Sequence, residues 1–262
     1  MNVQALLGWY ARVRRPLPWR ATRDPYSLLV SEVMLQQTQA ARVVPYYHAF
    51  LERFPDPRAL ADAPAAGVLA AWSGLGYNRR ALQLQRAARH VAEHGWPADL
   101  TELPGVGPYT AAAVSSFAFG AQRAAVDTNV RRVLERHDGQ HRTPGALASR
   151  AAELLPPGEA AAFNQAMMEL GATVCRPRRP DCGACPVRPG CASLGRSVDA
   201  PARRPAPRFE DTDRWARGRI LAAHVGGSPQ PELAPERRER AEGGLVRDGL
   251  LVRDPHGGLR LP

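Results

Sequence analysis

Four cysteines fall within one stretch of 17 residues, and the chain has no others: Cys175, Cys182, Cys185 and Cys191. Thiolates are soft ligands that suit an iron-sulfur cluster or a zinc ion. Zinc ribbons usually pair two C-x2-C knuckles. This C-x6-C-x2-C-x5-C spacing contains only one, so it favours a [4Fe-4S] cluster over a four-cysteine zinc site. Disulfides are the third alternative, which the lack of a signal-peptide pattern at the N-terminus disfavours.

A glycine pair near the middle of the chain lies in the run L-P-G-V-G-P-Y, residues 103–109. Two glycines two positions apart let the backbone turn tightly with its N–H groups outward, and Pro108 suits the first turn of a following helix. Amides at the positive end of a helix bind an anion without reading sequence. Gly105, Val106 and Gly107 are therefore candidates to hold a DNA phosphate, although a lone G-x-G is more often an ordinary turn.

Three runs around these motifs resemble one family. Residues 163–171 (F-N-Q-A-M-M-E-L-G) lead into the cysteines, residues 126–130 (V-D-T-N-V) follow the glycine turn, and residues 31–39 (S-E-V-M-L-Q-Q-T-Q) precede both. Together they resemble the adenine-DNA glycosylases of the MutY family, which belong to the helix-hairpin-helix superfamily with endonuclease III. The resemblance extends from about Trp9 to Cys191.

The resemblance implies a pair of catalytic carboxylates. Asp127 would face C1′ of an extruded nucleotide and stabilise or attack its oxocarbenium-like carbon, and Asn129 stands beside it in the same motif. Glu32 would be an acid with a raised pKa that protonates the adenine leaving group. Each carboxylate has a simpler alternative, because Asp127 could cap a helix and Glu32 could be an ordinary solvated side chain.

The chain contains no lysine, and all 35 of its basic residues are arginine. Bifunctional relatives carry a lysine two residues after the second glycine of the hairpin, where this chain has Tyr109. A lysine Schiff base is therefore excluded, and the resemblance implies a monofunctional enzyme in which water hydrolyses the N-glycosidic bond. Tyr109 would lie close to the catalytic aspartate, or would only pack the pocket wall.

Other matches to the family imply contacts with DNA. Residues 74–77 (G-L-G-Y) resemble the wedge loop that fills the gap left by a flipped base. The residues expected at DNA are Arg20, Gln37, Thr38, Leu75, Gly76 and Tyr77, together with Gly105, Val106 and Gly107 of the hairpin. Arg20 could equally be a structural ion-pair partner, whereas Arg79 and Arg80 are expected at phosphates.

The net charge of +10 and the pI near 10.4 predict a polyanionic partner, most commonly nucleic acid. A genome that favours arginine codons could supply part of this excess. No apolar run reaches about 18 residues, which excludes a membrane span. With the resemblance, these features imply a cytoplasmic monomer, without a membrane partner, that binds double-stranded DNA containing mismatched adenine.

Apolar residues recur at helical spacing, so the expected fold class is all-α. Helices are predicted near 27–39, 42–53, 64–71, 78–94, 108–119, 127–137, 145–155 and 159–173. The resemblance implies a six-helix barrel with the hairpin at 22–131, an iron-sulfur domain from 1–21 and 132–200, and a cleft between them. Residues 201–262 are expected to be a linker and a short, winged-helix-like segment, too short for a full Nudix-like domain.

Three functions stay open. The first is monofunctional excision of adenine mispaired with 8-oxoguanine or guanine, and the second is excision of thymine or uracil from T/G or U/G mismatches. The third is a non-catalytic iron-sulfur protein that binds DNA. Glu32 favours the first, because mismatch-thymine relatives generally lack an acid there, and retention of Glu32 and Asp127 together disfavours the third. Without a full Nudix-like domain, strict dependence on 8-oxoguanine is in doubt.

Overall fold

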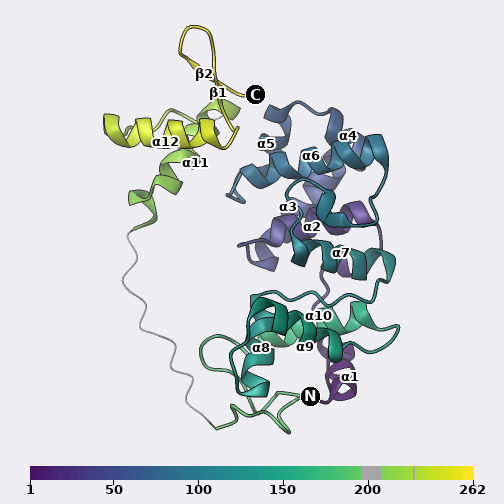
Figure 1. Ribbon diagram of the computed structural model, residues 1–262. Helices are drawn as coiled ribbons and strands as arrows, with labels where there is room; N and C mark the ends of the chain where they lie inside the picture. The colour runs from purple at the N-terminus through teal and green to yellow at the C-terminus, as the bar shows by residue number, and fades with distance from the viewer. Residues whose placement is uncertain (196–207, 227) are drawn as a thin grey trace. The chain divides into compact units, whose positions relative to one another are not determined.

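The computed structural model describes residues 1–195, 208–226 and 228–262. Figure 1 labels its elements: α1 (Val3–Val13), α2 (Pro25–Leu35), α3 (Ala40–Arg53), α4 (Pro57–Asp62), α5 (Ala65–Trp72), α6 (Arg79–His94), α7 (Pro108–Phe119), α8 (Thr128–Asp138), α9 (Pro144–Glu153), α10 (Ala160–Thr173), α11 (Asp213–Val225), α12 (Pro235–Arg247), β1 (Val252–Arg253) and β2 (Leu259–Arg260). Short 3-10 helices lie at Pro18–Arg20, Leu100–Glu102 and Phe209–Asp211. Within the described residues the only sheet is the antiparallel pair β1 and β2, so the predicted all-α class is confirmed.

The chain divides into two compact units. Unit 1 comprises Met1–Glu32, Asp99–Thr101 and Val106–Ala202, and unit 2 comprises Val33–Ala98, Glu102–Gly105 and Arg203–Pro262. The predicted barrel and iron-sulfur domains divide the chain at other points, and that functional division stays a prediction.

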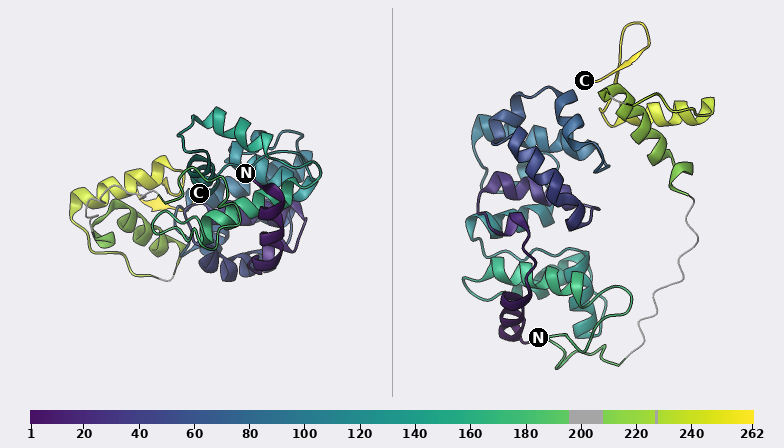
Figure 2. Two further views of the ribbon diagram at one scale, coloured as in Figure 1. Left: turned by 90° about the horizontal axis from the view of Figure 1, so that it is seen from below. Right: turned by 180° about the vertical axis from the view of Figure 1, so that it is seen from behind.

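Unit 1 is built around α10, which contacts α1, α7 and α8. Figure 2 shows the purple N-terminal helix beside the green helices of this unit. Phe163, Met167 and Leu170 are three or four positions apart on α10, so they share one face, and all are buried. Val130 and Leu134 of α8 belong to the same core, which fixes the start of α8 beside α10.

Unit 2 places α6 against α4 and α5. Trp72, the last residue of α5, is fully buried and meets Phe50 of α3 edge to face, with ring centres 5.8 Å apart. This aromatic pair anchors the point where the chain leaves α5 for the loop that leads to α6. The C-terminal helices α11 and α12 pack on each other, and α11 also contacts α5.

Most of the predicted helices are confirmed, with ends shifted by a few residues. The predicted helix at 27–39 is too long, because α2 ends at Leu35 and Gln37 has a left-handed backbone with φ 60°. The sequence analysis did not predict α1 or α4. The six residues of α4 are too few to show a helical period. No helix in the described part of the chain is long and apolar enough to cross a membrane.

Candidate active site and cysteine cluster

Asp127 is the N-cap of α8. Its Oδ1 accepts hydrogen bonds from the backbone N–H groups of Asn129 (2.8 Å) and Val130 (2.7 Å), and its Oδ2 accepts one from the Asn129 side-chain amide (2.9 Å). The capping role that the sequence left open is therefore confirmed. These three donors and the positive end of the helix fix the carboxylate and stabilise its negative charge, while Oδ2 can still accept a further partner.

Arg132 also binds the side chain of Asn129. Its Nη2 donates to Oδ1 of Asn129 (2.8 Å) and to the carbonyl of Gly171 (2.6 Å), and its Nε donates to the carbonyl of Cys175 (2.8 Å). A continuous series of hydrogen bonds thus joins Asp127 to the backbone of the first cysteine. The sequence analysis missed Arg132, although its place three residues after Asn129 on one helix was an available signal.

The close approach of α10 to the start of α8 depends on Gly171. A methyl group there would lie 2.6 Å from Cβ of Asn129 and 3.0 Å from its carbonyl oxygen. Both atoms belong to or adjoin the backbone, so they could not move aside cheaply. Glycine at this position therefore lets Asn129 stay where it supports Asp127.

Glu32 lies on α2, with its side chain buried in unit 1. Burial raises the pKa of Glu32 to about 7, opposed by a hydrogen bond from Tyr109 and assisted by the negative charge of Asp127. The pKa of Tyr109 is raised as well, first by burial and then by the charges of the two carboxylates. The structure therefore brings Glu32, Tyr109 and Asp127 together. An acid that titrates near neutral pH can donate a proton there, and a fixed carboxylate beside it can stabilise positive charge.

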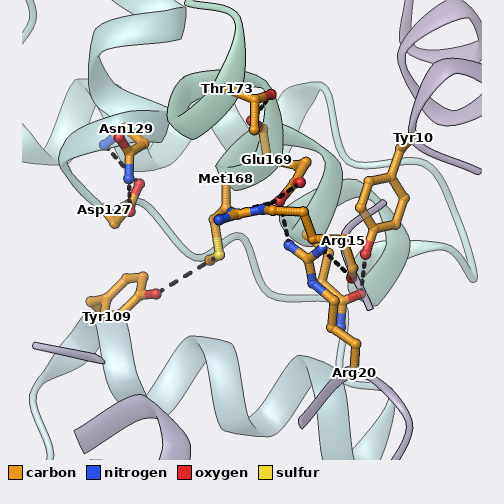
Figure 3. A network of polar contacts seen from close by, with 10 residues as sticks. Tyr10, Arg15, Arg20, Tyr109, Asp127, Asn129, Met168, Glu169 and Thr173 are labelled. Carbon is orange, nitrogen blue, oxygen red and sulfur yellow. Dashed lines mark hydrogen bonds and ion pairs between the residues drawn. The ribbon is translucent and has the colours of Figure 1, made fainter. Parts of the chain in front are cut away.

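Figure 3 shows Asp127 facing Asn129, with Tyr109 pointing toward Met168. The Tyr109 hydroxyl lies 3.8 Å from the Met168 sulfur, which is a weak acceptor. This contact ties α7 to α10 within unit 1. Tyr109 thus has both polar and packing contacts at the site.

All four cysteines are partly buried and free of disulfides, and Cys175 and Cys185 pack against the core of unit 1. Burial raises the pKa of the Cys185 thiol, and the negative charges of the other three cysteines raise it further, so the sulfurs lie close enough to act on one another. Arg136 approaches the Cys175 sulfur at 3.5 Å. Within residues 1–195, 208–226 and 228–262, no three His, Cys, Asp or Glu side chains converge on one ion position. The four partly buried thiols in one loop are a set of soft ligands that an iron-sulfur cluster or a zinc ion would take.

The glycine turn at residues 105–107 leads into α7. Gly105 has φ 78°, and a methyl group there would lie 2.6 Å from Cβ of Gln83, so the turn requires glycine. Gly107 is the N-cap of α7 and Pro108 its first residue. Val106 is buried and anchors the turn, while both glycines are exposed. Exposed backbone at the positive end of a helix is an arrangement that can hold a phosphate.

Gln37 and Tyr77 lie on exposed loops of unit 2, and both have left-handed backbones, with φ 60° and φ 50°. The side chain of Leu75 is buried at 4 % exposure, whereas Tyr77 is 42 % exposed, so Tyr77 is the side chain of this loop available to a partner. Thr38 is half-buried. Arg214 of α11 lies 4.1 Å from the centre of the Tyr77 ring and donates to its hydroxyl at 3.0 Å.

Arg20 is engaged within the protein, as the ion-pair alternative describes. Its Nη2 donates to Glu169 at 2.7 Å, and Arg15 donates to the same carboxylate (Figure 3). Burial acts to raise the pKa of Glu169, but the two arginines outweigh it and hold that pKa below its ordinary value. The DNA contact of Arg20 stays a prediction. The sequence analysis missed Glu169, because only the tertiary fold shows its partners.

The expected phosphate contact of Arg80 stays a prediction, because the structure contains no DNA. Its guanidinium is half-buried and donates to backbone carbonyls of unit 2. The neighbouring Arg79 has a side chain that is 62 % exposed, so a phosphate contact there stays a prediction.

Comparison with known proteins places the chain among DNA repair enzymes. Residues 30–157 match the HhH-GPD superfamily base excision DNA repair proteins. The adenine DNA glycosylase of Mycolicibacterium smegmatis (strain ATCC 700084 / mc(2)155) is 42% identical over 280 residues, which cover 98% of this chain and 94% of that protein. The adenine DNA glycosylase of Homo sapiens is 43% identical over 73% of this chain and 39% of its own length.

Two solved structures show the same fold. A thermostable thymine-DNA glycosylase matches with a TM-score of 0.68 at 34% identity, covering 72% of this chain and 93% of that chain. An endonuclease III trapped as a covalent intermediate with DNA matches with a TM-score of 0.64 at 25% identity, covering 72% of this chain and 92% of that chain.

Proposed function

The chain belongs to the adenine DNA glycosylase family of the HhH-GPD superfamily, and on that premise we propose that it excises adenine mispaired with 8-oxoguanine or guanine by hydrolysis. The observation that carries the proposal is the buried Glu32. Its pKa is about 7, and its side chain interacts with Tyr109 and with the Asp127 carboxylate. A site that only bound DNA would have no use for a carboxylic acid whose pKa is raised in this way.

Excision needs a proton on the leaving base and stabilisation of charge on the sugar. Adenine departs poorly as an anion, so a protonated Glu32 donates its proton to a ring nitrogen of the extruded base. Positive charge develops at C1′ as the N-glycosidic bond breaks, and the Asp127 carboxylate stabilises it. Asn129 keeps this carboxylate in place through its two N–H bonds. Water then completes the hydrolysis.

The proposed enzyme is monofunctional, because the chain has no lysine that could form a Schiff base with the sugar. Tyr109 stands in the place of that lysine and donates a hydrogen bond to Glu32. Its raised pKa keeps the phenol neutral, so it orients the acid without competing for the sugar carbon.

A [4Fe-4S] cluster fits the partly buried, mutually interacting thiols of Cys175, Cys182, Cys185 and Cys191. When bound, the cluster would hold the loop of the four cysteines together. The proposed hydrolysis needs no electron transfer. The residues of the chain connect this loop to the site, because Arg132 donates both to the Cys175 carbonyl and to Asn129.

Double-stranded DNA is the proposed partner, and the chain acts on it as a monomer. The net charge of +10 supports a polyanionic partner, and the endonuclease III structures similar to this chain contain DNA. The turn at residues 105–107 would grip a phosphate through its backbone amides. Gln37, Thr38 and Tyr77 would face the strand opposite the extruded adenine, with Leu75 and Gly76 shaping the loop.

Excision of thymine or uracil is the second candidate, favoured by the structural similarity to a thymine-DNA glycosylase at 34% identity. A single-turnover assay on duplexes with A opposite 8-oxoguanine, A/G, T/G and U/G, each analysed with and without alkali, separates the two. We expect cleavage of the adenine strands only after alkali treatment. Cleavage of only the T/G or U/G duplexes would support the second candidate. Cleavage of any strand without alkali would contradict a monofunctional enzyme.

Replacing Gly171 with alanine should lower the excision rate by about 10- to 100-fold, because the new methyl group displaces Asn129 and with it the Asp127 carboxylate. Single-turnover excision on the A/8-oxoguanine duplex measures the effect. Gly145→Ala in α9 is the matched control, since nothing lies within 4 Å of a methyl group there. Equal rates for Gly171→Ala and Gly145→Ala would contradict the role given to this close approach.

A further inference from the structure

The guanidinium of Arg80, near the start of α6, donates hydrogen bonds to four backbone carbonyls. Nη1 donates to the carbonyls of Val33 (2.6 Å), Met34 (3.2 Å) and Gln36 (2.6 Å), at and just beyond the end of α2. Nη2 donates to the carbonyl of Gly76 (3.1 Å), in the loop between α5 and α6. One side chain therefore ties together two loops of unit 2 that are far apart in the sequence.

Two of these carbonyls stand immediately before strained residues. Gln36 precedes Gln37, with φ 60°, and Gly76 precedes Tyr77, with φ 50°. In the part of the chain that the structure describes, Arg179 is the one other non-glycine residue with positive φ. For any residue other than glycine, a left-handed backbone conformation is unfavourable in free energy. It therefore persists only where the surroundings hold it. Arg80 is the hydrogen-bonding partner that both loops share.

Two aromatic rings lie near the guanidinium of Arg80. Its guanidinium carbon lies 5.5 Å from the ring centre of the buried Trp72 and 5.4 Å from that of Tyr77. Trp72 Nε1 also donates to the Gly76 carbonyl, at 3.2 Å. Burial lowers the pKa of Arg80 to about 10, which still leaves it charged at neutral pH. A cation at the end of α2 is also favoured by the helix dipole.

We propose that Arg80 is a positioning residue that holds Gln37 and Tyr77 in the strained conformations that display their side chains to DNA. The inference rests on the proposed function, in which an adenine leaves the duplex and the protein fills the gap. Both side chains are exposed although both backbones are strained, a combination typical of residues placed for an external partner. Arg80 itself need not touch DNA.

Arg86 offers a matched control. It carries the same charge on the same helix, six residues after Arg80, but its side chain is exposed. Arg86→Met and Arg80→Met therefore remove the same charge from the same helix. Arg80→Lys keeps the charge, but a single ammonium cannot span both loops as a guanidinium does.

Two measurements test the proposal on the full chain. The first is single-turnover excision from an A/8-oxoguanine duplex, and the second is the rise in fluorescence at saturating protein of 2-aminopurine placed at the adenine position, recorded before excision. We expect Arg80→Met to lose about 10- to 100-fold in rate and most of the fluorescence rise. Arg80→Lys should be intermediate, and Arg86→Met should stay within about twofold of wild type.

Three results would overturn the positioning role. One is an equal loss in Arg86→Met, which would assign the effect to charge alone. Another is a full fluorescence rise in Arg80→Met, and the third is a rate loss that merely follows the unfolded fraction measured by thermal melting. In each case a wild type that excises adenine leaves the proposed function standing. A wild type that excises no adenine would remove both proposals.

Discussion

Glu32→Gln is expected to reduce the single-turnover rate of adenine excision by about 10²- to 10⁴-fold, the usual contribution of a general acid. Glutamine fills the same volume and can still accept the hydrogen bond from Tyr109, but its amide cannot supply a proton to the leaving base. Because the site stays packed, binding to an A/8-oxoguanine duplex should change little. The measurement is excision from that duplex at saturating protein, quenched with alkali. A rate within a few-fold of wild type would mean that another group protonates adenine.

The same variant should lose the pH dependence of excision. Wild type needs Glu32 protonated, and its pKa is about 7, so the rate should be flat in mild acid and fall as pH rises through 7. The residual rate of Glu32→Gln should show no such fall. Glu169→Gln is a matched control, because Glu169 is also a buried glutamate of unit 1, yet its partners are Arg15 and Arg20. That variant should lose stability but keep the midpoint near pH 7.

Thermal unfolding provides an independent check on Glu32. Its pKa is raised in the folded state, so the folded protein binds more protons than the unfolded chain between about pH 4.5 and 7. Stability is therefore lost as pH rises through this window, by at most about 3 kcal/mol. Glu32→Gln removes this loss and should be at least as stable as wild type at pH 8. A less stable variant at pH 8 would mean that the carboxylate is held by partners that favour its charge.

Local patterns in the sequence predicted the parts of the site that depend on neighbours along the chain. Asp127 before the apolar pattern of α8 is a recognisable cap, and the glycines before Pro108 mark the start of α7. The side chains of Glu32 and Tyr109 could be proposed from resemblance, but their meeting could not, because it depends on how α2 and α7 pack. The raised pKa of Glu32 is likewise a property of burial in the fold.

Arginines were the hardest residues to predict. A run such as Arg79-Arg80 indicates a surface that binds phosphate, and the structure separates the two, with Arg79 exposed and Arg80 directed at backbone carbonyls. The helix predicted at 27–39 is too long for the same reason, because a tertiary contact decides where it ends. No glycine or proline marks an end of the helix between Leu35 and Gln39, but the tertiary contact of Arg80 with the Gln36 carbonyl lies where the helix ends at a left-handed residue. Contacts of this kind leave no periodic signal in one sequence.

Asp127→Asn tests whether the charge of this carboxylate matters apart from its role as a cap. Asparagine caps helices about as well as aspartate, so its oxygen can still accept from the N–H groups of Asn129 and Val130. Its neutral amide cannot stabilise positive charge on the sugar, and we expect excision to fall about 10²- to 10³-fold while the melting temperature changes little. Asp127→Ala should lose the same activity and also about 1 kcal/mol of stability, because the cap is gone.

Asp56→Ala is the matched control for the cap, since Asp56 caps α4 through a bond from the N–H of Ala59 at 2.8 Å. It should cost about 1 kcal/mol of stability and leave excision unchanged. A second readout follows from the electrostatics, because the charge of Asp127 helps to raise the pKa of Glu32. Removing that charge should move the midpoint of the residual pH profile below that of wild type. If Asp127→Asn excises adenine at the wild-type rate, or if its midpoint does not fall, then the two carboxylates do not act as a pair. The assignment of Asp127 to the developing positive charge would have to be abandoned.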